Sequence, residues 1–233
     1  MLMPRTSAQG RSTASATATT SVEDYAKTIY GLTEWDQAEV TASALAKKLG
    51  VSNPSVTLMI KKMAELGLVD HKPYAPVRLT AEGRRLALSM VRRHRLIETW
   101  LVQELDYGWE EVHGEAERLE HAVSETFVER LAEKLGHPST DPHGDPIPSR
   151  SLTLVYPETT RLCQAPPESS ARVEQVDDAV PEALRILTEQ DVAIGSTLNV
   201  VSTQDGAVQM TSDTGAFTLP HSVAHAVRVS TTA

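Results

Sequence analysis

Hydrophobic positions recur with helical spacing in the first patterned part of the chain. Residues three and four apart share one face of a helix, and the segment 21–35 places four hydrophobic residues on such a face: Val22, Tyr25, Ile29 and Leu32. Ser21 is the expected N-cap of this helix. The preceding residues 1–20 are rich in Ser, Thr and Ala and contain no acid. We expect a disordered tail there, although an organelle-targeting peptide has a similar composition.

Two shorter helices are predicted next, because the helical pattern resumes on both sides of a glycine. Thr41 can cap the first helix, and Gly50 breaks the pattern after it. Ser52 can cap the second helix, and Pro54 falls in its first turn, where a missing N–H costs little. Gly67 is expected to end the second helix.

The next segment, 68–79, has extended residues on both sides of a Pro-containing turn, which predicts a short hairpin. Thr80 then begins a helix that continues past His94. Helix, turn, helix and hairpin follow one another as in a winged helix-turn-helix, whose second helix enters a DNA groove while lysines meet phosphates. The residues expected to meet DNA are Ser52, Asn53, Pro54, Ser55, Thr57, Lys61, Lys62, His71 and Lys72. A winged helix used for protein contacts is the alternative.

In the second half of the chain, the residue composition and the pattern of hydrophobic positions change twice. A helix is expected over about 110–134, and residues 147–170, rich in Pro, Ser and Thr, are expected to form a linker. From residue 171 onward, short β-like runs alternate with Gly, Asp and Pro, and one short helix, PEALRILTEQ, interrupts them. This pattern predicts a small all-β barrel of the SH3-like kind.

Composition and charge narrow the class of protein. The single cysteine, Cys163, excludes an internal disulfide and fits the cytoplasm. No apolar run approaches the roughly 18 residues of a membrane span. The formal charge is −9, but it is uneven. Nine Lys/Arg and eight Asp/Glu give +1 over 21–90, whereas three Lys/Arg and thirteen Asp/Glu give −10 over 98–145. Bound cations are one way to relieve such an acidic segment, and a solvated helix surface is the other.

Histidines and glutamates within the acidic segment have the spacing of metal ligands. On a helix, four of them fall within an arc of about 100°: His113, Glu117, Glu120 and His121. They span more than two turns, so two adjacent sites are more natural than one. The preceding helix carries His94 and Glu98 four residues apart, a spacing that suits a two-ligand clip. We take the other histidines, among them His143, as structural or solvent-facing.

Together with the winged helix upstream, the run RRHRLIETWL…VHGEAERLEHAVSE…DPHGDPIP resembles the diphtheria-toxin-repressor (DtxR/MntR) family of metal-activated repressors, and LPHSVAHAVRV resembles the last strand of that family's SH3-like domain. The resemblance covers residues 21–233. It implies a homodimer in which one metal site matches His94, Glu98 and His113. It implies a second site matching Asp24, Glu117, Glu120 and His121. By rough alignment, Gln175 and Asp178 of the SH3-like domain match further ligands of the first site.

The implied fold is mainly α with β: a winged helix-turn-helix domain, a helical dimerisation and metal-binding domain, and a small all-β SH3-like domain. The expected boundaries are 1–20 for the tail, 21–91 for the DNA-binding domain, 92–146 for the dimerisation and metal-binding domain, 147–170 for the linker, and 171–233 for the SH3-like (FeoA-like) domain. The implied function is metal-activated repression of metal-homeostasis genes through a palindromic double-stranded operator.

Ligand chemistry indicates the metal. Iron-sensing members have Cys where Glu117 stands and Met where Asp24 stands, so the sulfur-free set here favours Mn²⁺. Fe²⁺ is the runner-up, and Co²⁺, Ni²⁺, Zn²⁺ or Cd²⁺ are expected surrogates. Two positions depart from the family pattern. Leu58 replaces a glutamine of the recognition helix, and Lys27 stands where some manganese-sensing members carry an extra acidic ligand, which disfavours a closely spaced metal pair.

Two other classes of protein compete with this interpretation. One is a winged-helix regulator that responds to a small molecule or a partner protein and ignores metal. The other is a metalloenzyme that uses the same ligands. The sequence lacks the HExxH motif, the paired ExxH motifs of di-iron bundles, and a nucleophile beside a base. We therefore expect no catalytic residues.

Overall fold

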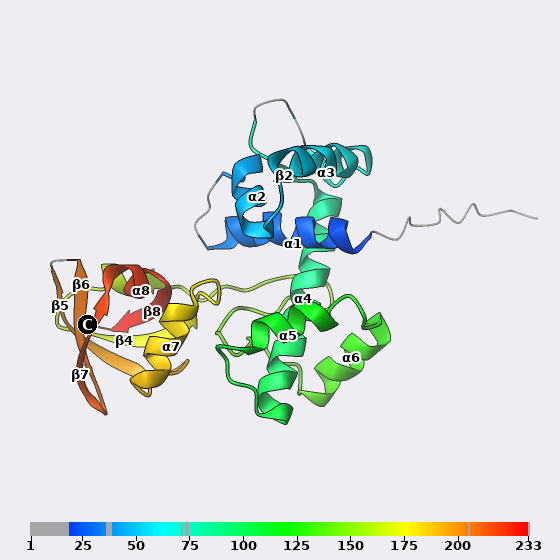
Figure 1. Cartoon of the computed structure of the whole chain (residues 1–233). Helices are drawn as coiled ribbons and strands as arrows, with labels where there is room; N and C mark the ends of the chain where they lie inside the picture. The colour runs from blue at the N-terminus through cyan, green and yellow to red at the C-terminus, as the bar shows by residue number, and fades with distance from the viewer. Residues whose placement is uncertain (1–18, 36–38, 71, 73–74, 205, 233) are drawn as a thin grey trace, which may run out of the picture.

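The computed structural model describes residues 19–35, 39–70, 72, 75–204 and 206–232. The chain forms three parts, each with its own hydrophobic core: a winged-helix part at the top of Figure 1, a helical part below it, and a β part at the side. The expected tail lies almost wholly outside the described residues. Among the described residues, no helix is long and apolar enough to cross a bilayer.

The winged-helix part contains α1 (Thr20–Glu34), α2 (Ala42–Leu49), α3 (Asn53–Glu65) and an antiparallel hairpin of β1 (Val69–Asp70) and β2 (Arg78–Leu79). The hydroxyls of Thr41 and Ser52 accept hydrogen bonds from backbone N–H groups three residues on, which confirms both predicted caps. Gly50 ends α2 with a left-handed φ of 66°. The prediction for Ser21 is wrong, because α1 already begins at Thr20 and Thr19 occupies the N-cap position.

The helical part contains α4 (Ala81–Leu105), α5 (Val112–Leu119) and α6 (Glu125–Lys134). Thr80 caps α4, which runs from the winged-helix part through the centre of the helical part (Figure 1). The single helix expected over 110–134 is wrong. The chain turns after α5, and Ser124 starts α6 by accepting a hydrogen bond from the backbone of Phe127. Glu120 keeps helical angles at the C-cap of α5, so it stays on the predicted stripe.

The β part is one six-stranded antiparallel sheet in the order β3-β8-β4-β5-β6-β7. Its elements are β3 (Thr160–Arg161), the 3-10 turn η1 (Leu162–Gln164), β4 (Ser169–Val176), α7 (Pro181–Glu189), β5 (Thr197–Gln204), β6 (Ala207–Ser212), β7 (Gly215–Pro220), α8 (His221–His225) and β8 (Val227–Thr232). The expected linker, 147–170, is too long, because β3 already pairs with β8 from residue 160.

Trp35 joins the winged-helix part to the β part. Its backbone carbonyl accepts hydrogen bonds from Arg161 Nη2 at 2.9 Å and Arg228 Nη2 at 2.8 Å. Both guanidinium groups also lie over its ring, 5.3 Å and 5.0 Å from the centroid. The two arginines thus satisfy a carbonyl at the C-terminal end of α1 and fix the β part against this helix.

Candidate metal centre

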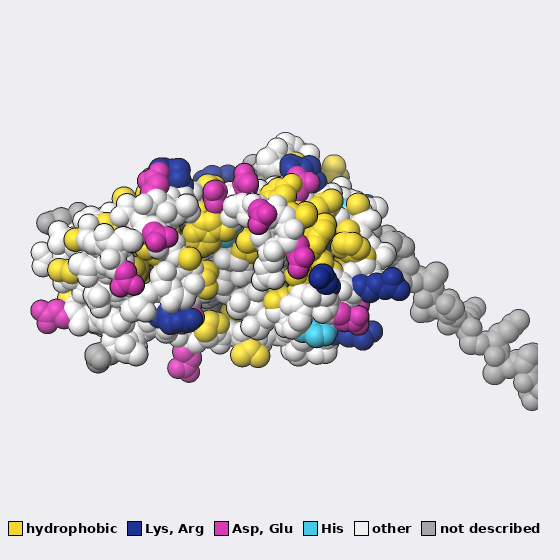
Figure 2. Space-filling model, turned by 90° about the horizontal axis from the view of Figure 1, so that it is seen from below, with side chains coloured by type: hydrophobic (Ala, Val, Ile, Leu, Met, Phe, Trp, Pro, Cys, Tyr) yellow, Lys and Arg dark blue, Asp and Glu magenta, His cyan; other side chains and the backbone are white. Residues whose placement is uncertain are grey.

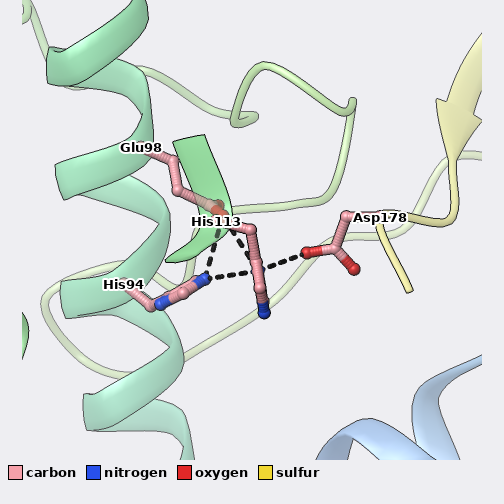
Figure 3. A group of neighbouring side chains, drawn as sticks. All are labelled: His94, Glu98, His113 and Asp178. Carbon is pink, nitrogen blue, oxygen red and sulfur yellow. Dashed lines mark hydrogen bonds and ion pairs between the residues drawn. The ribbon is translucent and has the colours of Figure 1, made fainter. Parts of the chain in front are cut away.

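The long helix α4 presents His94 and Glu98 one turn apart on a buried stripe, with 8% and 1% of their side chains exposed. Helix α5 packs against α4 and supplies His113, and the segment after β4 supplies Asp178. Figure 3 shows the four side chains directed toward one another. We call these residues the four-residue group, and it joins the helical part to the β part.

The distances within the four-residue group suit a shared cation. Glu98 Oε1 lies 2.9 Å from His94 Nε2 and 3.3 Å from His113 Nδ1. His113 Nδ1 lies 2.8 Å from Asp178 Oδ2. One possible ligand atom from each of the four residues lies within 4.8 Å of the others. Small inward movements would bring these atoms to metal–ligand distances of about 2.0–2.2 Å.

Charges in the four-residue group are strongly coupled. Burial lowers the pKa of His113, but hydrogen bonds to carboxylates, Asp178 first among them, outweigh burial and raise it to about 12. Burial raises the pKa of Asp178, but the hydrogen bond to His113 outweighs burial and brings it to about 2. Burial likewise opposes ionisation of Glu98, yet the neighbouring histidines hold its pKa well below the usual value. The group therefore carries ionised carboxylates around protonated imidazole.

A second cluster, the α1–α5 group, consists of Asp24, Glu120 and His121. His121 Nε2 lies 2.7 Å from Asp24 Oδ1 and 3.5 Å from Glu120 Oε1. Its other ring nitrogen, Nδ1, lies 2.9 Å from Glu23 Oε2. Glu23 was not among the residues predicted from the sequence, and the one feature that could have indicated it is its position beside Asp24 in the run VED. This group joins the first helix of the winged-helix part to the end of α5.

Two of the expected ligands lie apart from the groups to which they were assigned. Glu117 Oε1 is 3.4 Å from His113 Nε2 and 3.8 Å from Lys27 Nζ, so it lies between the two groups. Gln175 is buried on β4 and donates from Nε2 to Asp145 Oδ1 at 2.8 Å. Both remain predictions as ligands. Asp178, by contrast, lies beside His113, as the rough alignment suggested.

A third cluster, the loop group, consists of Glu98, Asp141 and His143. His143 is fully buried, so of the two expectations for this side chain, structural or solvent-facing, the solvent-facing one is wrong. Gly144 holds the loop against β4, where a Cβ would come within 1.9 Å of the carbonyl oxygen of Glu174. The signal in the sequence was the acid-Pro-His run DPH, but only the fold brings it to Glu98.

The loop group supplies a test of whether these residues fit a metal. His143 Nε2 lies 2.7 Å from the carbonyl oxygen of Trp109 and can donate to it, which directs the lone pair of a neutral ring to Nδ1. That Nδ1 is buried, has no hydrogen-bond partner among the described residues, and lies 4.0 Å from Glu98 Oε2. A buried acceptor beside a carboxylate is costly unless a cation or water binds it. The residues present therefore fit a divalent ion.

The expected DNA-contacting residues of α3 lie on its open face. Val56, Ile60 and Met63 are buried against the other helices. The following residues are exposed: Ser52, Asn53, Pro54, Ser55, Thr57, Lys61 and Lys62, together with Lys72 of the hairpin. Leu58 is 70% exposed on the same open face. His71 lies outside the described residues.

A winged helix joined by carboxylate–imidazole clusters to a helical part and a β part defines a metal-dependent DNA-binding regulator. Family models match in the same order. Residues 17–77 match "Iron dependent repressor, N-terminal DNA binding domain", residues 80–149 match "Iron dependent repressor, metal binding and dimerisation domain", and residues 160–231 match "FeoA domain".

Known proteins match over nearly the whole chain. The iron-dependent repressor IdeR of Mycobacterium leprae (strain TN) is 32% identical over 220 residues, 89% of this chain and 95% of that protein. A manganese-dependent transcriptional repressor solved in complex with manganese is 41% identical, with a TM-score of 0.86 over 91% of this chain and 100% of that one. ScaR with bound Zn²⁺ is 33% identical, with a TM-score of 0.78 over 90% and 98% of the chains.

The chain belongs to the diphtheria-toxin-repressor family of metal-dependent repressors. It is accordingly a metal-dependent DNA-binding repressor and not an enzyme. The predicted family and fold class are confirmed: a helix-turn-helix DNA-binding domain, a helical dimerisation and metal domain, and a C-terminal FeoA (SH3-like) β domain.

Proposed function

We propose that this repressor responds to Mn²⁺ and binds a palindromic operator as a homodimer when Mn²⁺ is bound. The observation that carries the proposal is the α1–α5 group, in which Asp24 of the DNA-binding domain meets Glu120 and His121 of the helical domain. An ion held there would tie the first helix of the winged-helix part to α5. The four-residue group would tie the β part to the same helical part.

The donor atoms favour manganese over iron. Carboxylate oxygens and imidazole nitrogens make up all three clusters, and none contains a sulfur atom. A relative 41% identical carries manganese in its solved structure. Fe²⁺ remains the alternative, since IdeR is an iron-dependent repressor and is 32% identical to this chain. Zn²⁺ and Cd²⁺ appear in solved ScaR structures, which supports their use as surrogates.

Metal binding would act on DNA affinity by restricting the position of α3. His121 contacts both Glu23 and Asp24 through hydrogen bonds that solvent can break, because each of these side chains is partly exposed. A shared ion would replace them with a tether of fixed geometry. Paired recognition helices would then keep the spacing of successive major grooves, and DNA in turn would tighten metal binding.

The helical domain offers a surface for the second subunit. Figure 2 shows hydrophobic side chains gathered over the end of the molecule formed by α4 and α6. Leu105, the last residue of α4, and Phe127 of α6 are 48% and 40% exposed, and Trp100 lies edge-on to Phe127 with ring centroids 6.4 Å apart. Because exposed hydrophobic patches mark protein interfaces, this face is the expected dimer contact.

The proposal is tested by comparing metals in one DNA-binding assay. Fragments would be selected from random DNA in parallel with Mn²⁺ and with a chelator, and affinity would then be measured by fluorescence anisotropy for each divalent ion at controlled free concentration. Mn²⁺ should activate DNA binding at a free concentration within the range found in the cytoplasm, and His121→Ala should abolish this activation. His137→Asn is the matched control, because exposed His137 has a φ of 56° that Asn tolerates. Activation by Fe²⁺ alone would favour the iron alternative, and equal binding with a chelator would refute both.

A further inference from the structure

Lys27 lies where the two metal-binding regions of the chain approach one another. It follows Asp24 by three residues on α1, so both side chains share one face of that helix. Its ammonium nitrogen is 2.6 Å from Glu120 Oε1, 3.4 Å from His94 Nδ1 and 3.8 Å from Glu117 Oε1. Only 17% of the side chain is exposed.

The oxygen that Lys27 contacts is also the one directed toward the α1–α5 group. Glu120 Oε1 accepts the short hydrogen bond from Lys27 and lies 3.5 Å from His121 Nε2. The other oxygen, Oε2, accepts a hydrogen bond from His94 Nδ1 at 2.5 Å. Both oxygens of Glu120 are therefore occupied, and a divalent ion bound with Asp24 and His121 must share or displace the ammonium.

The same ammonium also faces the four-residue group. His94 belongs to that group, and Glu117 contacts His113, another of its members. The positive charge thus lies between the two groups, within reach of carboxylates that would otherwise repel one another. It supplies one unit of charge at the place where a further divalent ion would have to bind to bridge the groups.

We propose that Lys27 is a built-in cation that competes with the activating metal for Glu120 and excludes a bridging ion between the two groups. The inference rests on the proposed metal-dependent function and concerns the number of ions and the concentration at which they bind. In the metal-free chain Lys27 neutralises Glu120. In the metal-bound chain it remains as a repulsive charge beside the α1–α5 group, so it raises the metal concentration needed for activation.

The test replaces Lys27 with an uncharged residue and measures metal binding without DNA. Lys27→Met keeps most of the side-chain volume, Lys27→Gln is a second uncharged variant, and Lys27→Arg retains the charge. Lys134→Met is the matched control, because it changes the net charge by the same amount as Lys27→Met. Lys134 is exposed and lies 4.0 Å from Glu104, outside the three clusters. Mn²⁺ affinity and the number of bound ions would be measured by calorimetry and metal analysis, and thermal stability would be measured with Mn²⁺ and with a chelator.

The uncharged variants should bind Mn²⁺ about tenfold more tightly or take up an additional ion, because the competing charge is gone. Their melting temperature should fall in chelator and recover with Mn²⁺. Lys27→Arg and Lys134→Met should match the unaltered protein. A purely structural lysine would instead lower the melting temperature equally with and without Mn²⁺ and leave affinity and ion number unchanged, which would overturn the inference. If the unaltered protein binds no Mn²⁺ at all, the proposed function fails as well, so the two failures are distinguishable.

Discussion

Raising the pH from 6.5 to 7.5 should tighten metal binding at the four-residue group at least about tenfold. His113 has a pKa of about 12 in the metal-free chain. Burial lowers the pKa of His94, but Glu98 and Glu120 outweigh burial and raise it. His113 therefore carries a proton throughout this range, and the raised pKa of His94 acts in the same direction, whereas an imidazole that binds a metal must be neutral. Each proton released contributes a factor of ten per pH unit, so the proton of His113 alone corresponds to about 1.4 kcal/mol.

The sign of the effect follows from the direction of the shifts. A histidine whose pKa is raised by folding stabilises the metal-free fold fully below its unfolded pKa of about 6.5. That contribution is lost as the pH rises toward the folded pKa, which for His113 is about 12. Rising pH thus weakens the competing protonated state while the carboxylates of Glu98 and Asp178, whose pKa values are lowered, stay ionised. Metal affinity must increase with pH.

The assay is calorimetry in buffers of different ionisation enthalpy, which counts the protons released on binding Mn²⁺. The His121→Ala background confines binding to the four-residue group and its neighbours. The account predicts that at least one proton is released there, about one fewer after the further change His113→Asn, and an unchanged number after the control change His137→Asn. A count of zero with an affinity that does not depend on pH would show that the imidazoles are already neutral, and would refute the reasoning.

Three other perturbations test separate contacts. Asp178→Asn should weaken metal binding at the four-residue group at least about tenfold, measured by calorimetry, and unchanged affinity would remove the β part from the site. Trp35→Ala should loosen the β part from α1, because it removes the ring under two guanidinium groups although the backbone carbonyl and its hydrogen bonds remain; faster hydrogen exchange or proteolysis between the two parts would show this, and an unchanged pattern would count against the ring contact. Gly144→Ala should lower the free energy of unfolding by roughly 2–4 kcal/mol in denaturant, since its Cβ would clash with the Glu174 carbonyl; a change below about 0.5 kcal/mol would contradict that clash.

Local sequence signals predicted most of the helical architecture. Caps at Thr41, Ser52 and Thr80 could be predicted because a hydroxyl before a periodic run satisfies free N–H groups within three residues. The break after α5 was missed because charged residues continue the helical pattern through it, and only the Ser124 cap marks the new start. The length of the linker was misjudged because β3 has just two residues, and its pairing partner, β8, lies at the far end of the chain.

Residue spacing alone predicted the candidate site only where its members share a helix, and the family resemblance supplied the partners on other elements, such as Asp24 and Asp178. His94 and Glu98 are one turn apart, so their spacing alone places them together. The loop group could not be derived in this way, because His143 reaches Glu98 through a loop whose position depends on Gly144 and β4. The position of Glu117 also depends on a neighbour, since His113 and Lys27 both attract its carboxylate. Tertiary contacts of this kind leave no periodic signal in a single sequence.

The central claim is that bound Mn²⁺ ties the DNA-binding domain to the helical domain and thereby raises DNA affinity. The most direct test is the dissociation constant of the selected DNA for the unaltered protein, measured at saturating Mn²⁺ and in chelator, with bound metal determined in the same samples. The account predicts binding at least about tenfold tighter with Mn²⁺, within the range usual for coupled sites, together with bound manganese. Equal dissociation constants in the two conditions, with manganese bound in one of them, would contradict it.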